Sequence, residues 1–336
     1  MRVIDYQGAS GTVLQDAVGY LADKRRALYA APLSNLRVDP DSGHLLNKDL
    51  GLDLPLTKFS ARRLATYVHV PTAWALRQPT DVVAGAMNYF LERGGGNLQV
   101  VTENDRCVVG FLPEGHVPVA GRVVVERLGE ERDGFTPVHW THDEFGLTVR
   151  SVTDRLTVEP KLGDTVQLGV DLMLRDDRDG LGVRGVAYRL VCMNGAIAEE
   201  ASAVRRMLRR EGWRDPAIRT DLAIDSFNEV SAELVGTWSA LQQAARHQLS
   251  LADDDDTERV RVLSRPLRVL GLPGRFTESV SDALRGEDQS LFGVYNAVTR
   301  LGRDAVTRQT RELFERAGYR VASRLDRVVE SLEVPA

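Results

Sequence analysis

Apolar residues recur every three or four positions in several N-terminal segments, and this spacing predicts amphipathic helices over residues 11–30, 57–68 and 81–93. The intervening residues 31–55 are rich in Pro, Asp and Gly and are predicted to form a loop. A short segment around Trp74 follows the second helix and is apolar rather than polar. It lacks the reading face of a DNA-binding helix-turn-helix, so we expect Trp74 to be buried in the core.

From Asn97 the period changes from 3.6 to 2, which is typical of half-buried strands. The alternation predicts a hairpin that turns at residues 103–106. Further predicted strands lie at residues 145–152, 156–158, 165–174 and 182–193. Together these segments predict an antiparallel sheet over about residues 97–193.

Beyond Gly195 the pattern returns to helical spacing, with helices predicted over residues 226–247, 277–302 and 304–332. Because the strands stand between helical segments and do not alternate with them, the predicted fold class is α+β. The antiparallel sheet is flanked by N-terminal helices and by a mostly helical C-terminal third. The predicted parts are residues 1–96 (N-terminal helical segment), 97–215 (sheet core with a following basic helix) and 216–336 (C-terminal helices). Residues 216–336 form either a separate domain or one continuous domain with the sheet core.

Composition excludes several classes of protein. The 336 residues are 43% hydrophobic, which suffices for a packed core. No apolar run approaches the roughly 18 residues that span a bilayer, and the first residues lack the apolar core of a signal peptide. Two cysteines, Cys107 and Cys192, are too few for a disulfide scaffold. We therefore expect a cytoplasmic protein without a membrane partner.

The charged residues are unevenly distributed. The net charge of −5 does not by itself favour a nucleic-acid partner. Four arginines, however, occupy one side of the helix predicted after Gly195, and guanidinium groups suit phosphate: Arg205, Arg206, Arg209 and Arg210. Such a stripe is either a solvated helix face or a phosphate-binding surface.

Candidate catalytic chemistry is sparse. His139 and His142 stand three residues apart before Asp143, but a metal site needs a third convergent ligand that the sequence does not supply, and we expect a polar loop at a strand edge. A second group of carboxylates is predicted in a turn between strands, where such groups usually bind backbone N–H groups or water: Asp171, Asp176, Asp177 and Asp179. No metal, cofactor or catalytic residue is predicted, although an enzyme is not excluded.

Three segments resemble a phage/plasmid-like protein family known as domain of unknown function 932. They are residues 54–65 with the following Val70-Pro71, residues 189–195 (Arg-Leu-Val-Cys-Met-Asn-Gly), and residues 291–300. Their order and spacing agree with the family over roughly residues 50–325. The chain departs from the family at residues 106–113, where relatives carry a basic, aspartate-containing strand. The resemblance implies a mobile-element context.

We hypothesise that the protein is a nucleic-acid-binding module, similar to the single-strand annealing proteins of phages. Those proteins typically set a curved antiparallel sheet beside a helix, assemble as rings and hold the nucleic-acid backbone in a basic groove. Such binding needs sequence-independent phosphate contacts and a stacking face. The predicted contacts to single-stranded DNA are Arg184, Tyr188, Arg189, Arg205, Arg206, Arg209 and Arg210, in a homo-oligomer. The alternatives are a protein that binds a host or phage partner through its C-terminal helices, and a metal-dependent nucleic-acid enzyme.

Overall fold

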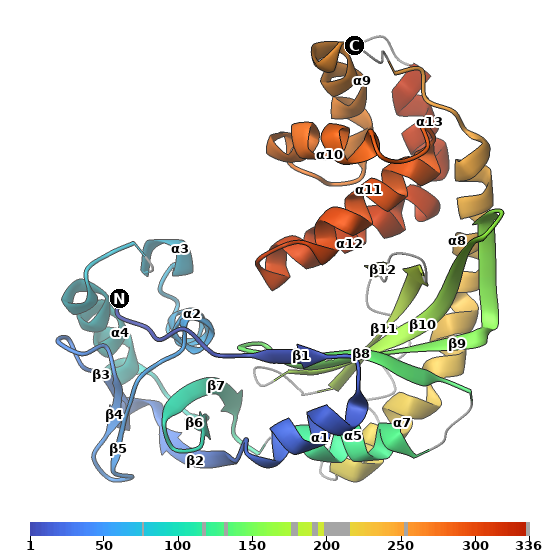
Figure 1. The fold of residues 1–336 in the computed structure, drawn as a ribbon. Coiled ribbons are helices and arrows are strands. Elements are labelled where there is room, and N and C mark those ends of the chain that lie inside the picture. Colours follow the sequence, from blue (N-terminus) through green and yellow to red (C-terminus); the bar gives the residue numbers. More distant parts are fainter. Residues whose placement is uncertain are drawn as a thin grey trace.

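The computed structural model describes residues 1–75, 77–115, 119–130, 134–175, 181–189, 194–197, 216–251 and 255–333 (Figure 1). Helices and antiparallel sheets confirm the predicted α+β class. The main sheet has the strand order β1-β8-β9-β10-β11-β12, with antiparallel neighbours throughout. Its strands are β1 (Ala9–Gly11), β8 (Thr136–Asp143), β9 (Gly146–Lys161), β10 (Asp164–Arg175), β11 (Leu181–Arg189) and β12 (Asn194–Ile197).

The two faces of the main sheet differ in chemistry. Alternate β10 residues such as Val170 and Leu172 are buried beneath α1 (Leu14–Ala22), α5 (Gly121–Gly129) and α7 (Pro216–Asp225). The long helix α8 (Phe227–Arg246) also packs on this apolar face, where its Leu241 and Ala244 share a core with strand residues. The β10 residues that alternate with these, including Asp171, point to the opposite face of the sheet. Strand β10 therefore presents charged side chains on one face of the sheet, while its apolar side chains on the other face are covered by helices.

A glycine allows two of these strands to approach closely. The register between β9 and β10 shifts at Gln167/Leu168, and Gly169 then pairs with Val152. A Cβ atom at Gly169 would collide with the backbone carbonyl oxygen of Ser151. Such an irregularity increases the local twist of the strands. Because only a residue without a Cβ atom permits this close approach, Gly169 helps to set the curvature of β9 and β10.

The N-terminal part contains two further sheets. One has the order β2-β6-β7, and the other is a small β3-β4-β5 meander. The strands are β2 (Arg26–Pro32), β3 (Arg37–Val38), β4 (Leu45–Asn47), β5 (Leu52–Leu54), β6 (Asn97–Glu103) and β7 (Cys107–Pro113). The accompanying helices are η1 (Leu33–Asn35), α2 (Lys58–Tyr67), α3 (Thr72–Ala75) and α4 (Thr80–Arg93). These elements enclose a core of their own.

Several predictions for this part are confirmed. The β6–β7 hairpin turns through Asn104 and Asp105, both with positive φ, as residues 103–106 predicted. Helix α2 confirms the helix predicted over residues 57–68, and Thr57 caps it by accepting a hydrogen bond from the Ser60 backbone N–H at 3.1 Å.

Other predictions for this part are wrong. The predicted sheet of residues 97–193 is divided, because β6 and β7 pair with β2 and not with the main sheet. The predicted helix over residues 11–30 ends at Ala22, since Ala27 and Leu28 fit either period in so short a run. Residues 31–55 form short strands besides loops. Trp74 keeps 37% of its surface exposed, because Ala75 and not Trp74 faces the core.

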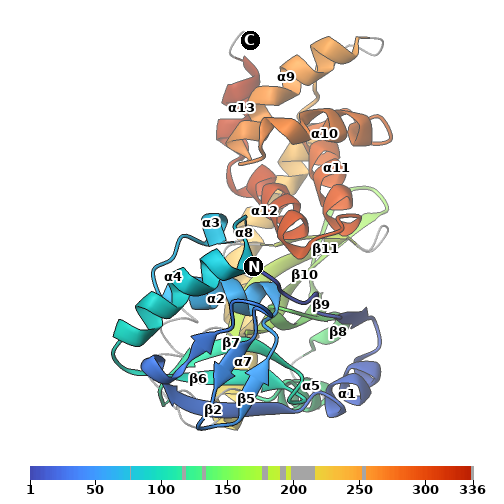
Figure 2. The same cartoon turned by 90° about the vertical axis from the view of Figure 1, so that its left-hand side faces the viewer.

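The C-terminal helices lie together, away from the N-terminal sheets, and some of them contact the main sheet at β12 (Figures 1 and 2). They are α9 (Asp256–Val269), η2 (Gly274–Phe276), α10 (Thr277–Leu284), α11 (Leu291–Arg303), α12 (Arg308–Ser323) and α13 (Leu325–Glu333). The two long helices predicted after residue 276 are each divided. Ser290 caps a new helix, α11, within the first, and the non-helical backbone of Arg324 separates α12 from α13 within the second. These helices share one hydrophobic core with β10 and β11 through Val166, Leu168 and Ala187.

Within the described ranges, no helix combines the length and the apolar character needed to cross a bilayer.

Candidate functional site

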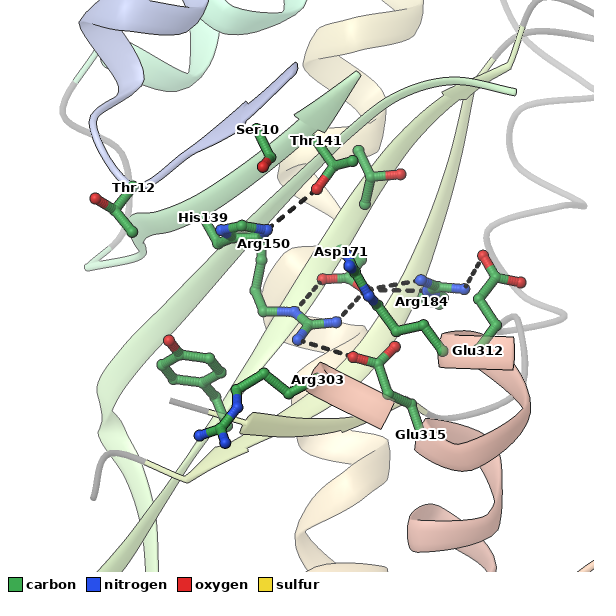
Figure 3. A pocket seen from close by; sticks show the side chains of 13 residues that line it. Ser10, Thr12, His139, Thr141, Arg150, Asp171, Arg184, Arg303, Glu312 and Glu315 are labelled. Atoms are coloured by element: carbon green, nitrogen blue, oxygen red, sulfur yellow. Dashed lines mark hydrogen bonds and ion pairs between the residues drawn. The ribbon is translucent and has the colours of Figure 1, made fainter. Parts of the chain in front are cut away.

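A row of polar side chains crosses four strands on the face of the main sheet opposite α8. The strand register places His139 opposite Arg150, Arg150 opposite Asp171, and Asp171 opposite Arg184. Directly opposed residues in antiparallel strands have neighbouring side chains. Four strands thus bring one histidine, two guanidinium groups and one carboxylate side by side, as Figure 3 shows.

Asp171 holds both arginines. Arg150 donates from Nε to Oδ1 at 2.7 Å and from Nη2 to Oδ2 at 3.0 Å. Arg184 donates from Nε to Oδ2 at 3.1 Å, and its Nη2 lies 3.0 Å from the same oxygen. Burial alone would raise the pKa of the Asp171 carboxyl, but the two guanidinium charges and their hydrogen bonds lower it to about 2. Asp171 is therefore charged near neutral pH and fixes the orientation of both arginines.

Helix α12 supplies two more carboxylates from the other side (Figure 3). Glu315 Oε1 lies 3.5 Å from Arg150 Nη1, and Glu312 Oε1 lies 3.4 Å from Arg184 Nη1. Burial raises the pKa of Glu315, against the opposing effect of Arg150 and Arg184. Each arginine thus bridges the sheet and α12, with the shorter contacts on the sheet side.

These groups border a cavity of about 300 Å³ between the sheet and the ends of α11 and α12. Its lining comprises Ser10, Thr12, His139, Thr141, Thr148, Arg150, Asp171, Arg184, Tyr188, Arg303, Arg311, Glu312 and Glu315. Four guanidinium groups thus face three carboxylates. Within the described part of the chain, the buried Nε of Arg311 has no hydrogen-bond partner. Arg303 is also paired with Asp304, with 2.9 Å between Nε and Oδ1, so the donor available to an anion is the buried Nε of Arg311.

His139 lies at the edge of this cavity in a neutral form. Its Nε2 is 3.1 Å from Thr141 Oγ1. Burial lowers the pKa of His139 to about 4, and the charges of Arg150 and Arg311 add to this effect. Near neutral pH its imidazole contributes hydrogen-bonding capacity but no charge.

His139 and His142 do not form a metal site. Both belong to β8 and not to a loop, which corrects the prediction of a polar loop at a strand edge. Residues three apart in a strand point to opposite faces, so the two imidazoles cannot converge on one ion. Among the residues that the structure describes, no group of three or more His, Cys, Asp or Glu side chains could hold a metal.

His142 instead belongs to a second polar cluster, which joins β8 to strands β2 and β6 of the N-terminal part. Tyr6 donates its hydroxyl proton to Glu103 Oε2 at 2.7 Å, and the same hydroxyl lies 3.1 Å from His142 Nδ1. The hydroxyl oxygen must then accept from Nδ1–H, which assigns the neutral Nδ1-protonated tautomer to His142. Lys24 and Arg26 each lie 3.0 Å from Glu103. Burial lowers the pKa of His142 to about 3, with help from the Arg26 charge.

The structure places two of the predicted DNA-binding residues in the cavity. Arg184 and Tyr188 both line it and are largely buried, so neither forms an open basic surface. The Arg150 guanidinium lies 6.0 Å from the centre of the Tyr188 ring. Arg189 ends β11, but its side chain lies outside what the structure describes. The remaining four also lie outside the described residues: Arg205, Arg206, Arg209 and Arg210.

Sequence reasoning missed most of the cavity. Arg150, Arg303, Arg311, Glu312 and Glu315 were not predicted as site residues. The one available signal was Arg150, a cation in a run of alternating strand residues next to Val149. A charge at such a position indicates a buried partner. The α11 and α12 residues carry no comparable signal, because exposed helices commonly have this composition.

Comparison of the chain with protein-family models, with curated proteins and with solved structures finds no match.

Proposed function

We propose that the protein binds single-stranded nucleic acid, with backbone phosphates entering the cavity between the main sheet and α12. The observation that carries this proposal is the gathering of four guanidinium groups around one cavity, with the buried Nε of Arg311 lacking a hydrogen-bond partner among the described residues. Guanidinium groups gathered at one cavity attract an anion locally, whatever the net charge of the whole chain.

The arrangement of these groups suits phosphate. Arg150 and Arg184 are held in fixed orientations by Asp171, so little side-chain freedom is lost when a ligand binds. Arg311 brings a half-buried guanidinium whose Nε lacks a hydrogen-bond partner in the described residues. Guanidinium groups bind phosphate oxygens through paired N–H groups. Serine and threonine hydroxyls along the same wall supply further donors that do not distinguish between bases.

The fold supports the same proposal. An antiparallel sheet with the long helix α8 on its apolar face has the layout expected of the single-strand annealing proteins of phages. The resemblance to domain of unknown function 932 points to the same mobile-element context. Assembly into a homo-oligomer and a cytoplasmic location belong to this proposal as well.

The test is fluorescence anisotropy of labelled single-stranded and duplex oligonucleotides at about 50 and 200 mM salt. We expect tighter binding of the single strand, weakened by salt. Arg311→Gln should reduce the slope of log affinity against log salt by about 0.7, the value for one lost phosphate contact. Arg268→Gln on α9 removes an exposed arginine away from the cavity and serves as the matched control.

Absence of binding to either oligonucleotide would refute the proposal. A protein partner at the C-terminal helices would then be the leading alternative.

A small phosphorylated ligand is the second candidate, because about 300 Å³ is at the lower end of the volumes of small-molecule sites. Competition by a mononucleotide against the labelled oligonucleotide distinguishes the two. Tight mononucleotide binding without oligonucleotide binding would favour the second candidate.

A further inference from the structure

Arg150 and Arg184 each use their guanidinium group in two different ways. The Nε and Nη2 groups of both arginines are directed at Asp171, at distances of 2.7 to 3.1 Å. The remaining Nη1 of each points to a carboxylate on α12, at 3.5 Å for Glu315 and 3.4 Å for Glu312. One side of each guanidinium is thus fixed by the sheet, while the other makes a longer contact to a helix far along the chain.

We propose that Glu312 and Glu315 are internal substitutes for phosphate, which occupy Arg184 and Arg150 until phosphate groups of a bound strand displace them. This inference rests on the proposed function, since it names what regulates the same site. A carboxylate oxygen and a phosphate oxygen accept the same kind of charge-assisted hydrogen bond, so the two ligands compete for the same Nη1 groups.

Glu312 has an alternative position once displaced. Its side chain is 24% exposed, and its Oε2 already lies 3.8 Å from Arg316 Nη2, one helical turn further along α12. A rotation toward Arg316 exchanges one ion pair for another of the type that stabilises exposed helix surfaces. Release of Arg184 therefore leaves no unpaired charge on α12.

Glu315 lies deeper, and its negative charge is less favourable there. It is almost completely buried, and burial raises its pKa. Its hydrogen bond to Arg150 is at the limit of a useful distance, whereas Asp171 contacts the same arginine at 2.7 Å. A phosphate with better geometry can therefore replace Glu315 without disturbing the pairing of Arg150 with Asp171.

The experiment measures the affinity of a fluorescein-labelled oligothymidylate of about 20 nucleotides for the full chain and its variants. The variants are Glu312→Gln, Glu315→Gln and the double variant, which keep side-chain size and remove the charge. Glu330→Gln on α13 removes the same charge from an exposed position away from the cavity and is the matched control. Thermal melting of each variant reports whether it is folded. Glu312→Gln keeps the test usable if the buried variant fails to fold, because Glu312 is partly exposed.

We expect each cavity variant to bind about fivefold tighter or more, a usual size for coupling between competing ligands, while Glu330→Gln stays close to the wild type. Binding in the double variant alone would also support the inference. Wild-type binding with no gain in folded variants would overturn it and leave the proposed function standing. Failure of the wild type and the double variant alike would overturn both.

Discussion

Asp171 and Arg150 lie directly opposite each other on β10 and β9 and share two hydrogen bonds of 2.7 and 3.0 Å. The Asp171 side chain has no exposed surface, and that of Arg150 has 11%. Because Arg184 binds the same carboxylate, one negative charge orients two positive ones inside the protein. Loss of that charge would leave two buried cations facing each other across β10.

We therefore predict that Asp171→Asn lowers the free energy of unfolding by about 3–5 kcal/mol, the usual cost of breaking a buried ion pair from one side. Urea unfolding of the variant and the wild type measures the difference. Asp326→Asn on α13, at an exposed position, should change stability by less than about 0.5 kcal/mol. A loss below about 1 kcal/mol for Asp171→Asn would show that the two arginines are compensated by other groups.

Removal of the charge of Glu315 is predicted to have the opposite effect on stability. Because burial raises the pKa of Glu315, the folded state disfavours its charged form, and a penalty develops as pH rises above the ordinary value of 4.5. Glu315→Gln removes that penalty, so stability relative to the wild type should increase from pH 4 to pH 7. Urea unfolding at several pH values measures the difference. A relative stability that falls over this range would mean that Arg150 and Arg184 outweigh burial, and that the pKa of Glu315 is lowered.

The sequence predicted the elements of this site better than the site itself. The alternation of residues 165–174 and 182–193 identified two paired strands, and the fold class followed from their place between helices. Arg184 was selected as a phosphate contact, and the structure buries it against Asp171, a partner 13 residues earlier in the chain that the sequence did not indicate. Alternation alone does not reveal which face of a strand is buried, because a shift of one residue reverses the assignment.

The other half of the cavity depends on distant pairing. Glu315 reaches Arg150 across 165 residues of sequence, and no periodic pattern links them. The division of the predicted sheet has a similar cause. Residues 26–32 pair with β6 through backbone hydrogen bonds that their side chains do not specify. Local patterns determine the type of an element, and tertiary packing determines its neighbours.

The buried histidines predict sensitivity to mild acid. The pKa of His142 is lowered to about 3 and that of His139 to about 4, whereas unfolded histidine titrates near 6.5. The unfolded chain therefore binds protons first, and stability falls as pH decreases below about 6.5. For His142 the loss should reach about 2 kcal/mol at pH 5, since one pKa unit corresponds to about 1.36 kcal/mol.

Urea unfolding at pH 7, 6 and 5 measures this loss. His142→Gln should be less stable than the wild type at pH 7 but lose less on acidification. His69→Asn removes an exposed histidine at a position with positive φ, which asparagine tolerates, and should follow the wild type. Equal stability of the wild type at pH 7 and pH 5 would contradict neutral, buried imidazoles.

Replacement of two glycines by alanine should change the stability of the protein in opposite directions. A Cβ atom at Gly169 would collide with the Ser151 carbonyl oxygen, while one at Gly85, on the exposed side of α4, would meet no atom within 4 Å. Gly169→Ala should therefore destabilise the protein by about 1–3 kcal/mol, as forced overpacking does, and weaken oligonucleotide binding by shifting β9 against β10. Gly85→Ala should stabilise it by about 1 kcal/mol through higher helix propensity, with binding unchanged.

Thermal melting and the anisotropy assay together measure both effects. A tolerated alanine at Gly169 would mean that β9 and β10 can separate without loss, and that the curvature of the sheet does not depend on their close approach.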